Sequence, residues 1–185
     1  IITASSIYDD AEKDFPGGYH PVDYSKALGK ITVRRAIESS QNIPFVEIMQ
    51  ELKPSVSMDY LERLGITTLT EEDNNLSLAL GGLQKGISPL EMAAAYAAIA
   101  NDGQYIEPVF YQNIKNHSGE TIITPKQDTR RVFSKETAFI LKDLLTQPVE
   151  GSNGTATYCK INGIDVAAKT GTTDSNYDRW LCGFT

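Results

Sequence analysis

Two short apolar runs near the end of the chain, separated by a polar turn, constrain its fold most strongly. Residues 164–168 read Ile-Asp-Val-Ala-Ala, and residues 180–184 read Trp-Leu-Cys-Gly-Phe. Runs of this length are typical of buried strands, and the polar segment 174–178 between them favours an antiparallel hairpin. The sequence Lys169-Thr170-Gly171 stands at the exit of the first strand. The pattern therefore predicts that a lysine, a threonine and a glycine follow one another along a strand.

These strand residues suit an anionic, extended ligand. Lys169 supplies a compact positive charge with three hydrogen-bond donors. The threonine hydroxyls can bind a carboxylate, and Gly171 allows a ligand backbone to approach closely because it has no side chain. If the strand lies at the edge of its sheet, its free N–H groups can pair with a peptide. The alternative is an ordinary strand that ends in a turn, because threonine favours strands and glycine ends them.

The composition excludes several classes of function. The net charge is −7 with no block of lysine or arginine, which argues against nucleic-acid binding. The longest apolar run, residues 92–100, is far shorter than a membrane span, so we expect no membrane contact from these residues. Cys159, Cys182, His20 and His117 lack the spacing of a metal site or a disulfide framework.

Capping signals predict several helices in the first two thirds of the chain. Thr32 and Ser88 stand before apolar helical patterns, and Ser88-Pro89-Leu90-Glu91 reads as a capping box. Pro44 suits the first turn of a helix that runs to about Leu52. We expect a further helix from about Ser57 to Leu64 and an alanine-rich, buried helix over 92–100.

The remaining segments are predicted from turn and breaker residues. Residues 1–30 are rich in Asp, Gly, Pro and Tyr and are expected to be irregular. Residues 105–124 are expected to form a polar hairpin with its turn at 116–119. Ser134 is expected to cap a last helix, stopped by Pro148. Helices followed by a terminal sheet indicate an α+β fold.

Two motifs now combine in a recognisable order. Ser40-Gln41-Asn42 lies at a predicted helix–helix corner, where Asn42 could equally be a simple turn or capping residue, and Lys169-Thr170-Gly171 lies on the late strand. With these motifs and three further stretches the chain resembles the transpeptidase domain of bifunctional (class A) penicillin-binding proteins. The three stretches are residues 35–44, 81–93 and 178–185.

This resemblance implies a fold and a domain organisation. The fold is the penicillin-binding/β-lactamase-like transpeptidase fold, an antiparallel sheet packed with helices, here as an incomplete portion. Residues 1–185 would form part of a single transpeptidase domain. Within it we expect a helical region with Ser-x-Asn at about 30–103, a hairpin and helix at 104–150, and the Lys-Thr-Gly strand hairpin at 160–185.

The resemblance also implies a catalytic chemistry, serine acyl transfer from peptides that end in D-Ala-D-Ala. Ser40 would relay protons towards the leaving amine, and Asn42 would hold the substrate amide. Lys169 would polarise Ser40 and attract the substrate carboxylate. No metal and no cofactor are implied.

Three neighbouring residues would bind the substrate. Thr170 would hydrogen-bond the carboxylate, Gly171 would leave room for it, and the N–H of Thr172 would supply half of an oxyanion hole. The implied partners are peptidoglycan stem peptides and β-lactam antibiotics. The implied location is the extracytoplasmic face of the bacterial cell membrane, to which the parent protein would be anchored.

One departure from the family pattern concerns the nucleophile. No serine of this sequence has a lysine three residues later, so the Ser-x-x-Lys motif is absent from the 185 residues. We expect that motif to lie N-terminal to Ser40, in a region that precedes Ile1. The isolated chain is therefore expected to be inactive.

Three alternatives stay open. A β-lactamase would need a deacylating glutamate in a Glu-x-x-Leu-Asn-type loop, and Glu71 and Glu72 lack that pattern. A non-catalytic penicillin-binding fold used as a sensor or scaffold would keep Lys-Thr-Gly without the nucleophile. A D,D-carboxypeptidase, which passes the acyl group to water, would use the same residues.

Overall fold

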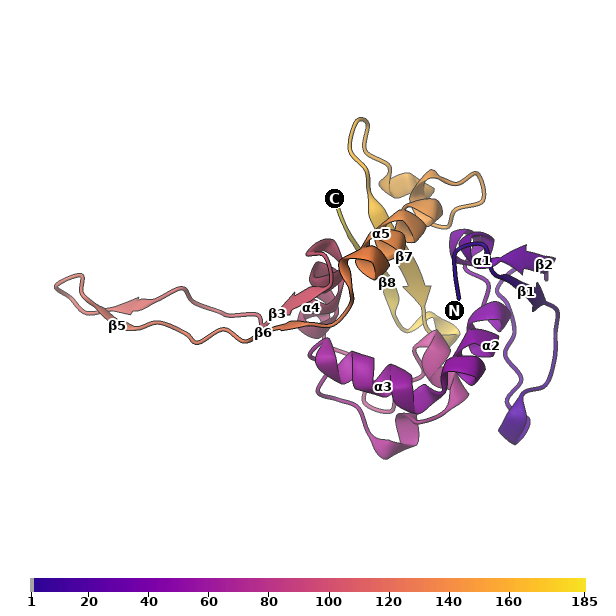
Figure 1. The fold of residues 1–185 in the computed structure, drawn as a ribbon, viewed down its shortest axis with the longest axis horizontal. Helices are drawn as coiled ribbons and strands as arrows, with labels where there is room; N and C mark the ends of the chain where they lie inside the picture. Colours follow the sequence, from indigo (N-terminus) through magenta and orange to yellow (C-terminus); the bar gives the residue numbers. More distant parts are fainter. Residues whose placement is uncertain (1) are drawn as a thin grey trace.

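The computed structural model of the protein describes residues 2–185, apart from the side chain of Asp174. Figure 1 shows a compact body of helices and short strand pairs, from which a long two-stranded arm projects. The α-helices are α1 (Val33–Ser39), α2 (Ile43–Leu52), α3 (Pro54–Arg63), α4 (Pro89–Ala100) and α5 (Lys135–Glu150). Short 3-10 turns occur at Pro16–Gly18, Glu71–Asp73, Leu76–Leu80, Thr157–Cys159 and Asp174–Asn176.

The strands form separate antiparallel pairs in the described residues. The strands are β1 (Ile7–Asp10), β2 (Gly29–Thr32), β3 (Gln104–Ile106), β4 (Ile114–Lys115), β5 (Thr121–Ile123), β6 (Thr129–Arg131), β7 (Ala167–Thr172) and β8 (Arg179–Phe184). β1 pairs with β2, β3 with β6, β4 with β5, and β7 with β8. In the last pair Lys169 lies opposite Cys182, and Gly171 opposite Trp180. The predicted terminal hairpin is confirmed, and Lys-Thr-Gly lies inside its first strand.

The predicted helix caps are present. The Thr32 hydroxyl accepts from the N–H of Arg35 at 3.2 Å and begins α1. Ser88 and Glu91 form the reciprocal capping box of α4, and Ser134 accepts from the N–H of Thr137 to begin α5. These contacts satisfy helix N–H groups that have no partner inside the helix.

Two helix boundaries differ from the prediction. The helix α3 begins at Pro54, three residues before the expected Ser57, because proline fits the first turn of a helix. The helix α5 continues through Pro148 to Glu150. Its last carbonyls find partners in the following loop, where the N–H of Ala156 donates to the Pro148 oxygen at 2.8 Å. Burial of Pro148 and Val149 favours this helical last turn over an early stop.

The N-terminal segment is more ordered than expected. Residues 1–30 were predicted to be irregular, yet Ile7–Asp10 forms a strand with Gly29–Thr32. Residues 11–28 separate the two strands. Strands this far apart are not joined by a short hairpin turn, so the sequence carries no turn signal for their pairing.

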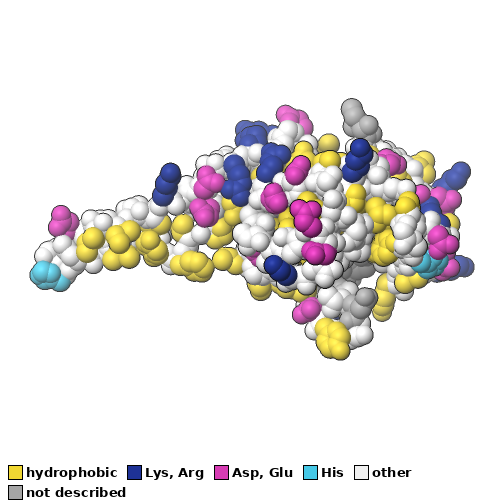
Figure 2. Space-filling model, turned by 90° about the horizontal axis from the view of Figure 1, so that it is seen from below, with side chains coloured by type: hydrophobic (Ala, Val, Ile, Leu, Met, Phe, Trp, Pro, Cys, Tyr) yellow, Lys and Arg dark blue, Asp and Glu magenta, His cyan; other side chains and the backbone are white. Residues whose placement is uncertain are grey.

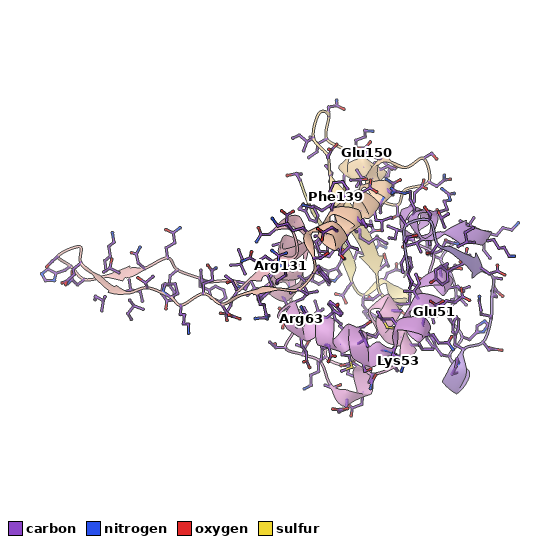
Figure 3. The ribbon with its side chains drawn as sticks, viewed as in Figure 1. Glu51, Lys53, Arg63, Arg131, Phe139 and Glu150 are labelled. Carbon is purple, nitrogen blue, oxygen red and sulfur yellow. The ribbon has the colours of Figure 1, made fainter. Side chains whose placement is uncertain are left out.

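The predicted hairpin of residues 105–124 is present only in its outer part, where β4 pairs with β5, whereas residues 105 and 106 pair with β6 at the base of the arm (Figure 1). At its base Arg63 of α3 donates to the Arg131 carbonyl at 2.8 Å (Figure 3). Figure 2 shows apolar side chains along one side of the arm. The exposed apolar residues of the arm are Ile106, Val109, Phe110, Tyr111, Ile114, Ile122 and Ile123.

The helix α5 connects α1 with the terminal hairpin. It packs against both α1 and β7. An ion pair between Arg34 of α1 and Asp143 of α5 adds to the first contact. Val149 of α5 lies in an apolar cluster with Ala168 of β7. Because α5 contacts both α1 and β7, it fixes the position of one relative to the other.

The alanine-rich helix α4 is packed closely, as expected. Ala94, Ala95 and Ala98 are buried in a cluster with Leu64 and Tyr105. The helix contacts β3, β8 and α5, because small side chains let neighbouring elements approach. In residues 2–185 no helix combines the length and apolar character that a membrane crossing requires.

The capping box of α4 generates a prediction about acid stability. Hydrogen bonds from the Ser88 side chain, the Ser88 N–H and Thr67 lower the pKa of Glu91 to about 2. A lowered pKa contributes stability above the unfolded-state value, and this contribution is lost as pH falls from about 4.5 towards 2. We expect Glu91→Gln to lower the free energy of unfolding at pH 7 by about 1 kcal/mol, which chemical denaturation can measure.

The difference between wild type and Glu91→Gln should shrink as the pH is lowered through this window. Glu62→Gln, at an exposed position of α3, is the matched control and should change little. A difference that stays constant with pH would contradict the assignment.

Candidate active site

The two sequence motifs meet at one contact. The Nζ atom of Lys169 on β7 donates to Ser40 Oγ at 2.6 Å, although 129 residues separate the two in sequence. The same Nζ donates to the Thr170 carbonyl at 2.9 Å. Burial lowers the pKa of the Lys169 ammonium below its usual value. The contact places a partly desolvated cation against a serine hydroxyl, which it can polarise.

Ser40 has an unusual backbone conformation. It is left-handed, with φ of 56° and ψ of 43°, at the end of α1. Its N–H bonds to the Ile37 carbonyl at 3.3 Å, and the Gln41 N–H bonds to the Ala36 carbonyl at 3.0 Å. A serine in this region costs about 1 kcal/mol relative to a right-handed one. In this conformation the Ser40 hydroxyl accepts from Lys169 Nζ.

Asn42 is held by the segment that follows the first strand. Its side-chain Nδ2 donates to the Val22 carbonyl at 2.7 Å, and its backbone N–H donates to Asp23 Oδ1. The N–H of Ile43 donates to the same carboxylate oxygen at 3.4 Å. Asp23 thus caps the start of α2, and the Oδ1 atom of Asn42 is the remaining polar atom of its side chain.

A second carboxylate lies beneath this corner. Asp10 and Gln41 are almost completely buried, and Gln41 Nε2 donates to Asp10 Oδ2. The Leu28 N–H donates to the same oxygen at 2.7 Å. The buried atoms Asp10 Oδ1 and Asp23 Oδ2 have no other donor among the described residues.

Burial raises the pKa of Asp23. The N–H of Asn42 opposes this rise in pKa, whereas hydrogen bonding and charge repulsion from Asp10 add to it. Asp23 therefore favours the protonated form more than an exposed aspartate does.

The three residues after Lys169 complete the strand β7. The Thr170 hydroxyl lies 2.8 Å from the Thr155 hydroxyl, from a glycine-rich loop. A Cβ at Gly171 would meet only Trp180 Cβ, at 3.8 Å, whereas a Cβ at Gly183 would lie 2.5 Å from the Ala167 oxygen. Packing thus requires glycine at 183 but not at 171. Thr172, exposed at the end of β7, pairs with Arg179.

The strand β7 pairs only with β8 in the part of the chain that the structure describes. Alternate backbone groups of an antiparallel strand point to opposite sides, so one side of β7 carries N–H and C=O groups without a strand partner. This edge lies beside the Lys169–Ser40 contact.

The predicted site residues thus form one region. Ser40, Lys169 and Thr170 are connected by hydrogen bonds, and Asn42 lies two residues beyond Ser40. The sequence analysis did not identify Asp10, Asp23 or Thr155. These residues hydrogen-bond to motif residues from segments that are distant in sequence, and no periodicity or spacing marks them.

Among the described residues the cysteines form no disulfide and the cysteines and histidines form no metal site. Cys159 and Cys182 are free thiols, and His20 pairs with Asp14 at 2.9 Å near the surface. Across residues 2–185 no three of the His, Cys, Asp and Glu side chains described come together as a metal site.

Comparison with known proteins places this geometry among relatives. The sequence model of the penicillin binding protein transpeptidase domain matches residues 2–184. Penicillin-binding protein 1F of Bacillus subtilis (strain 168) is 39% identical over 176 residues, 91% of this chain. The chain spans only 24% of that protein.

Solved structures show the same fold. Penicillin-binding protein 1A from Haemophilus influenzae aligns with a TM-score of 0.86 at 25% identity, covering 99% of this chain and 33% of that one. Penicillin-binding protein A from M. tuberculosis, solved as an imipenem acyl-enzyme complex, aligns with a TM-score of 0.82 at 20% identity. The alignment covers 98% of this chain and 46% of that one, and it supports the fold alone. The predicted mixed fold of helices and antiparallel strands is confirmed.

The carboxyl pair generates a stability prediction. In Asp23→Asn, the amide oxygen can keep the bonds from Asn42 and Ile43, while the amide nitrogen donates to Asp10 Oδ1. A raised folded-state pKa means that ionising Asp23 costs stability as pH rises through that pKa. We expect Asp23→Asn to raise the free energy of unfolding at pH 7 by about 1 kcal/mol, measured by denaturant titration.

The gain should diminish as the pH is lowered through the raised pKa of wild-type Asp23. Asp9→Asn, at the exposed neighbouring position of β1, makes the same chemical change on a carboxylate that accepts no hydrogen bond among the described residues, and it should leave stability nearly unchanged. Asp23→Ala should destabilise, because two N–H groups lose their acceptor. An Asp23→Asn protein that is less stable than wild type at pH 7 would refute the interpretation that ionised Asp23 is unfavourable at this site.

Proposed function

The chain belongs to the family of penicillin-binding protein transpeptidase domains, and from this premise we propose that it carries the Ser-x-Asn and Lys-Thr-Gly parts of a peptidoglycan D,D-transpeptidase site. The observation that carries the proposal is the 2.6 Å contact between Lys169 Nζ and Ser40 Oγ. It joins two motifs from distant segments into one polar centre. The class A relatives support the same reading.

The substrate proposed is a stem peptide that ends in D-Ala-D-Ala. Its terminal carboxylate would meet Lys169 and accept a hydrogen bond from the Thr170 hydroxyl. The open space over Gly171 would admit the peptide backbone beside β7. The N–H of Thr172 would face the carbonyl oxygen as part of an oxyanion hole, and the free Oδ1 of Asn42 would accept from the substrate amide.

The proposed reaction is an acyl transfer in two steps. A serine oxygen bonds to the carbonyl carbon of the penultimate D-Ala, while the bond from that carbon to the terminal nitrogen breaks. The nucleophile passes its proton to the lysine of its own Ser-x-x-Lys motif, outside these residues, and Ser40 relays a proton from that lysine to the leaving nitrogen, so that D-Ala departs as an amine. An acceptor amine then attacks the ester, which frees the serine and forms the cross-link.

Lys169 makes the Ser40 step easier in this scheme. Its Nζ donates to Ser40 Oγ, so the serine O–H stays free to donate to the leaving nitrogen. The ammonium also offsets negative charge that develops as the nucleophile attacks.

The nucleophilic serine is proposed to lie outside these 185 residues, which contain no Ser-x-x-Lys. We place the whole protein at the extracytoplasmic face of the bacterial cell membrane, where stem peptides are available. β-Lactams would enter the same site as acylating mimics of the substrate.

Labelled penicillin tests the proposal on the full-length protein that carries this sequence. We expect one covalent adduct, located by peptide mapping on a serine outside residues 1–185. Lys169→Ala should slow the labelling by ~100-fold or more, because a preorganised charge is lost from the site. Lys160→Ala is the matched control, since Lys160 is an exposed lysine paired with Glu150, and should label normally.

Each outcome bears on a different part of the proposal. An unlabelled wild type would refute the function, and an adduct on a serine of this chain would refute the location of the nucleophile. Normal labelling of Lys169→Ala would remove Lys169 from the mechanism.

A further inference from the structure

The Thr155–Thr170 contact lies next to the proposed carboxylate site. The two hydroxyl oxygens are 2.8 Å apart, and either can be the donor. Thr155 belongs to the glycine-rich loop of residues 151–156, between α5 and β7. None of the motifs identified in the sequence includes it.

The loop that carries Thr155 is fixed on both sides. A Cβ at Gly154 would lie 2.1 Å from the Pro148 oxygen, so no side chain fits there. On the other side, the N–H of Ala156 bonds to that oxygen at 2.8 Å, and Ala156 is buried in the cluster with Val149 and Ala168. The backbone around Thr155 is therefore held against α5 and β7.

The loop is also tied to the end of α1. The N–H of Asn153 donates to Glu38 Oε1 at 2.9 Å, and Glu38 pairs with Arg35 at 2.9 Å. A Cβ at Gly151 would lie 2.5 Å from the same Glu38 oxygen. Glu38 precedes Ser40 by two residues, so one helix end positions both the serine and the loop.

Hydrogen-bond stoichiometry then gives Thr155 a role. A threonine hydroxyl has one proton to donate and two lone pairs. If Thr170 donates its proton to a substrate carboxylate, it has no proton left for Thr155. Thr170 must then accept the hydrogen bond that Thr155 donates. The Thr170 carbonyl already accepts from Lys169 at 2.9 Å, which fixes the backbone and leaves only the hydroxyl free to rotate.

We propose that Thr155 is a positioning residue that donates to Thr170 and so aims the Thr170 hydroxyl at the substrate carboxylate. This inference rests on the proposed function and deepens it. The donated bond also polarises the Thr170 hydroxyl, which makes it a stronger donor to an anion. Thr155 itself does not touch the substrate.

The test is a double-mutant cycle in the full-length protein, with the second-order rate of labelling by penicillin as the readout. Thr155→Val keeps the shape and removes the donor, and we expect it to slow acylation about tenfold. In a Thr170→Val background the same change should slow acylation less than twofold, because Thr155 acts only through Thr170. Thr155→Ser, which keeps the hydroxyl, should restore the wild-type rate to within about twofold.

Control variants separate this role from a structural one. Thr157→Val makes the same change at an exposed threonine two residues away and should leave both labelling and melting temperature unchanged. Independent, multiplicative effects of Thr155→Val and Thr170→Val would overturn the proposal, as would a Thr155→Val protein that labels like wild type. Failure of the wild type to label would instead refute the proposed function itself.

Discussion

The burial of the Lys169 ammonium beside Ser40 is the constraint on which the arrangement of this protein depends. A charged group that loses water needs acceptors close by, and Lys169 has the Ser40 hydroxyl and the Thr170 carbonyl. Those acceptors come from α1 and β7, which are distant in sequence. The helix α5 meets this requirement, because it packs against both elements and fixes their separation.

The Ser40 corner shows how a strained turn is kept in place. The left-handed conformation of Ser40 is unfavourable by itself, so its neighbours must hold it. Gln41 points inward to Asp10, and the backbone of Asn42 is capped by Asp23. Both carboxylates come from the segment before α1, which explains why β1 and the loop after it are ordered around this corner.

The sequence predicted the local elements well and the long-range support poorly. Caps such as Thr32, Ser88 and Ser134 act within one helical turn, so a few consecutive residues are enough to identify them. Pro148 and the strand Ile7–Asp10 were predicted incorrectly, because packing partners far along the chain decide both. The same limit hid Asp23 and Thr155, whose roles arise only when separate segments meet. The motif residues themselves were found because their order along the chain resembles a known family.

Packing in the hairpin requires glycine at position 183 but not at position 171. At Gly183 the opposite strand leaves no space for a side chain, so packing alone accounts for that glycine. At Gly171 a Cβ would make only one ordinary contact. The fold therefore leaves space at Gly171, on the same strand as Lys169 and Thr170. An extended ligand with an anionic end would fill it, and a side chain at 171 would obstruct the approach that the neighbouring Lys169 and Thr170 favour.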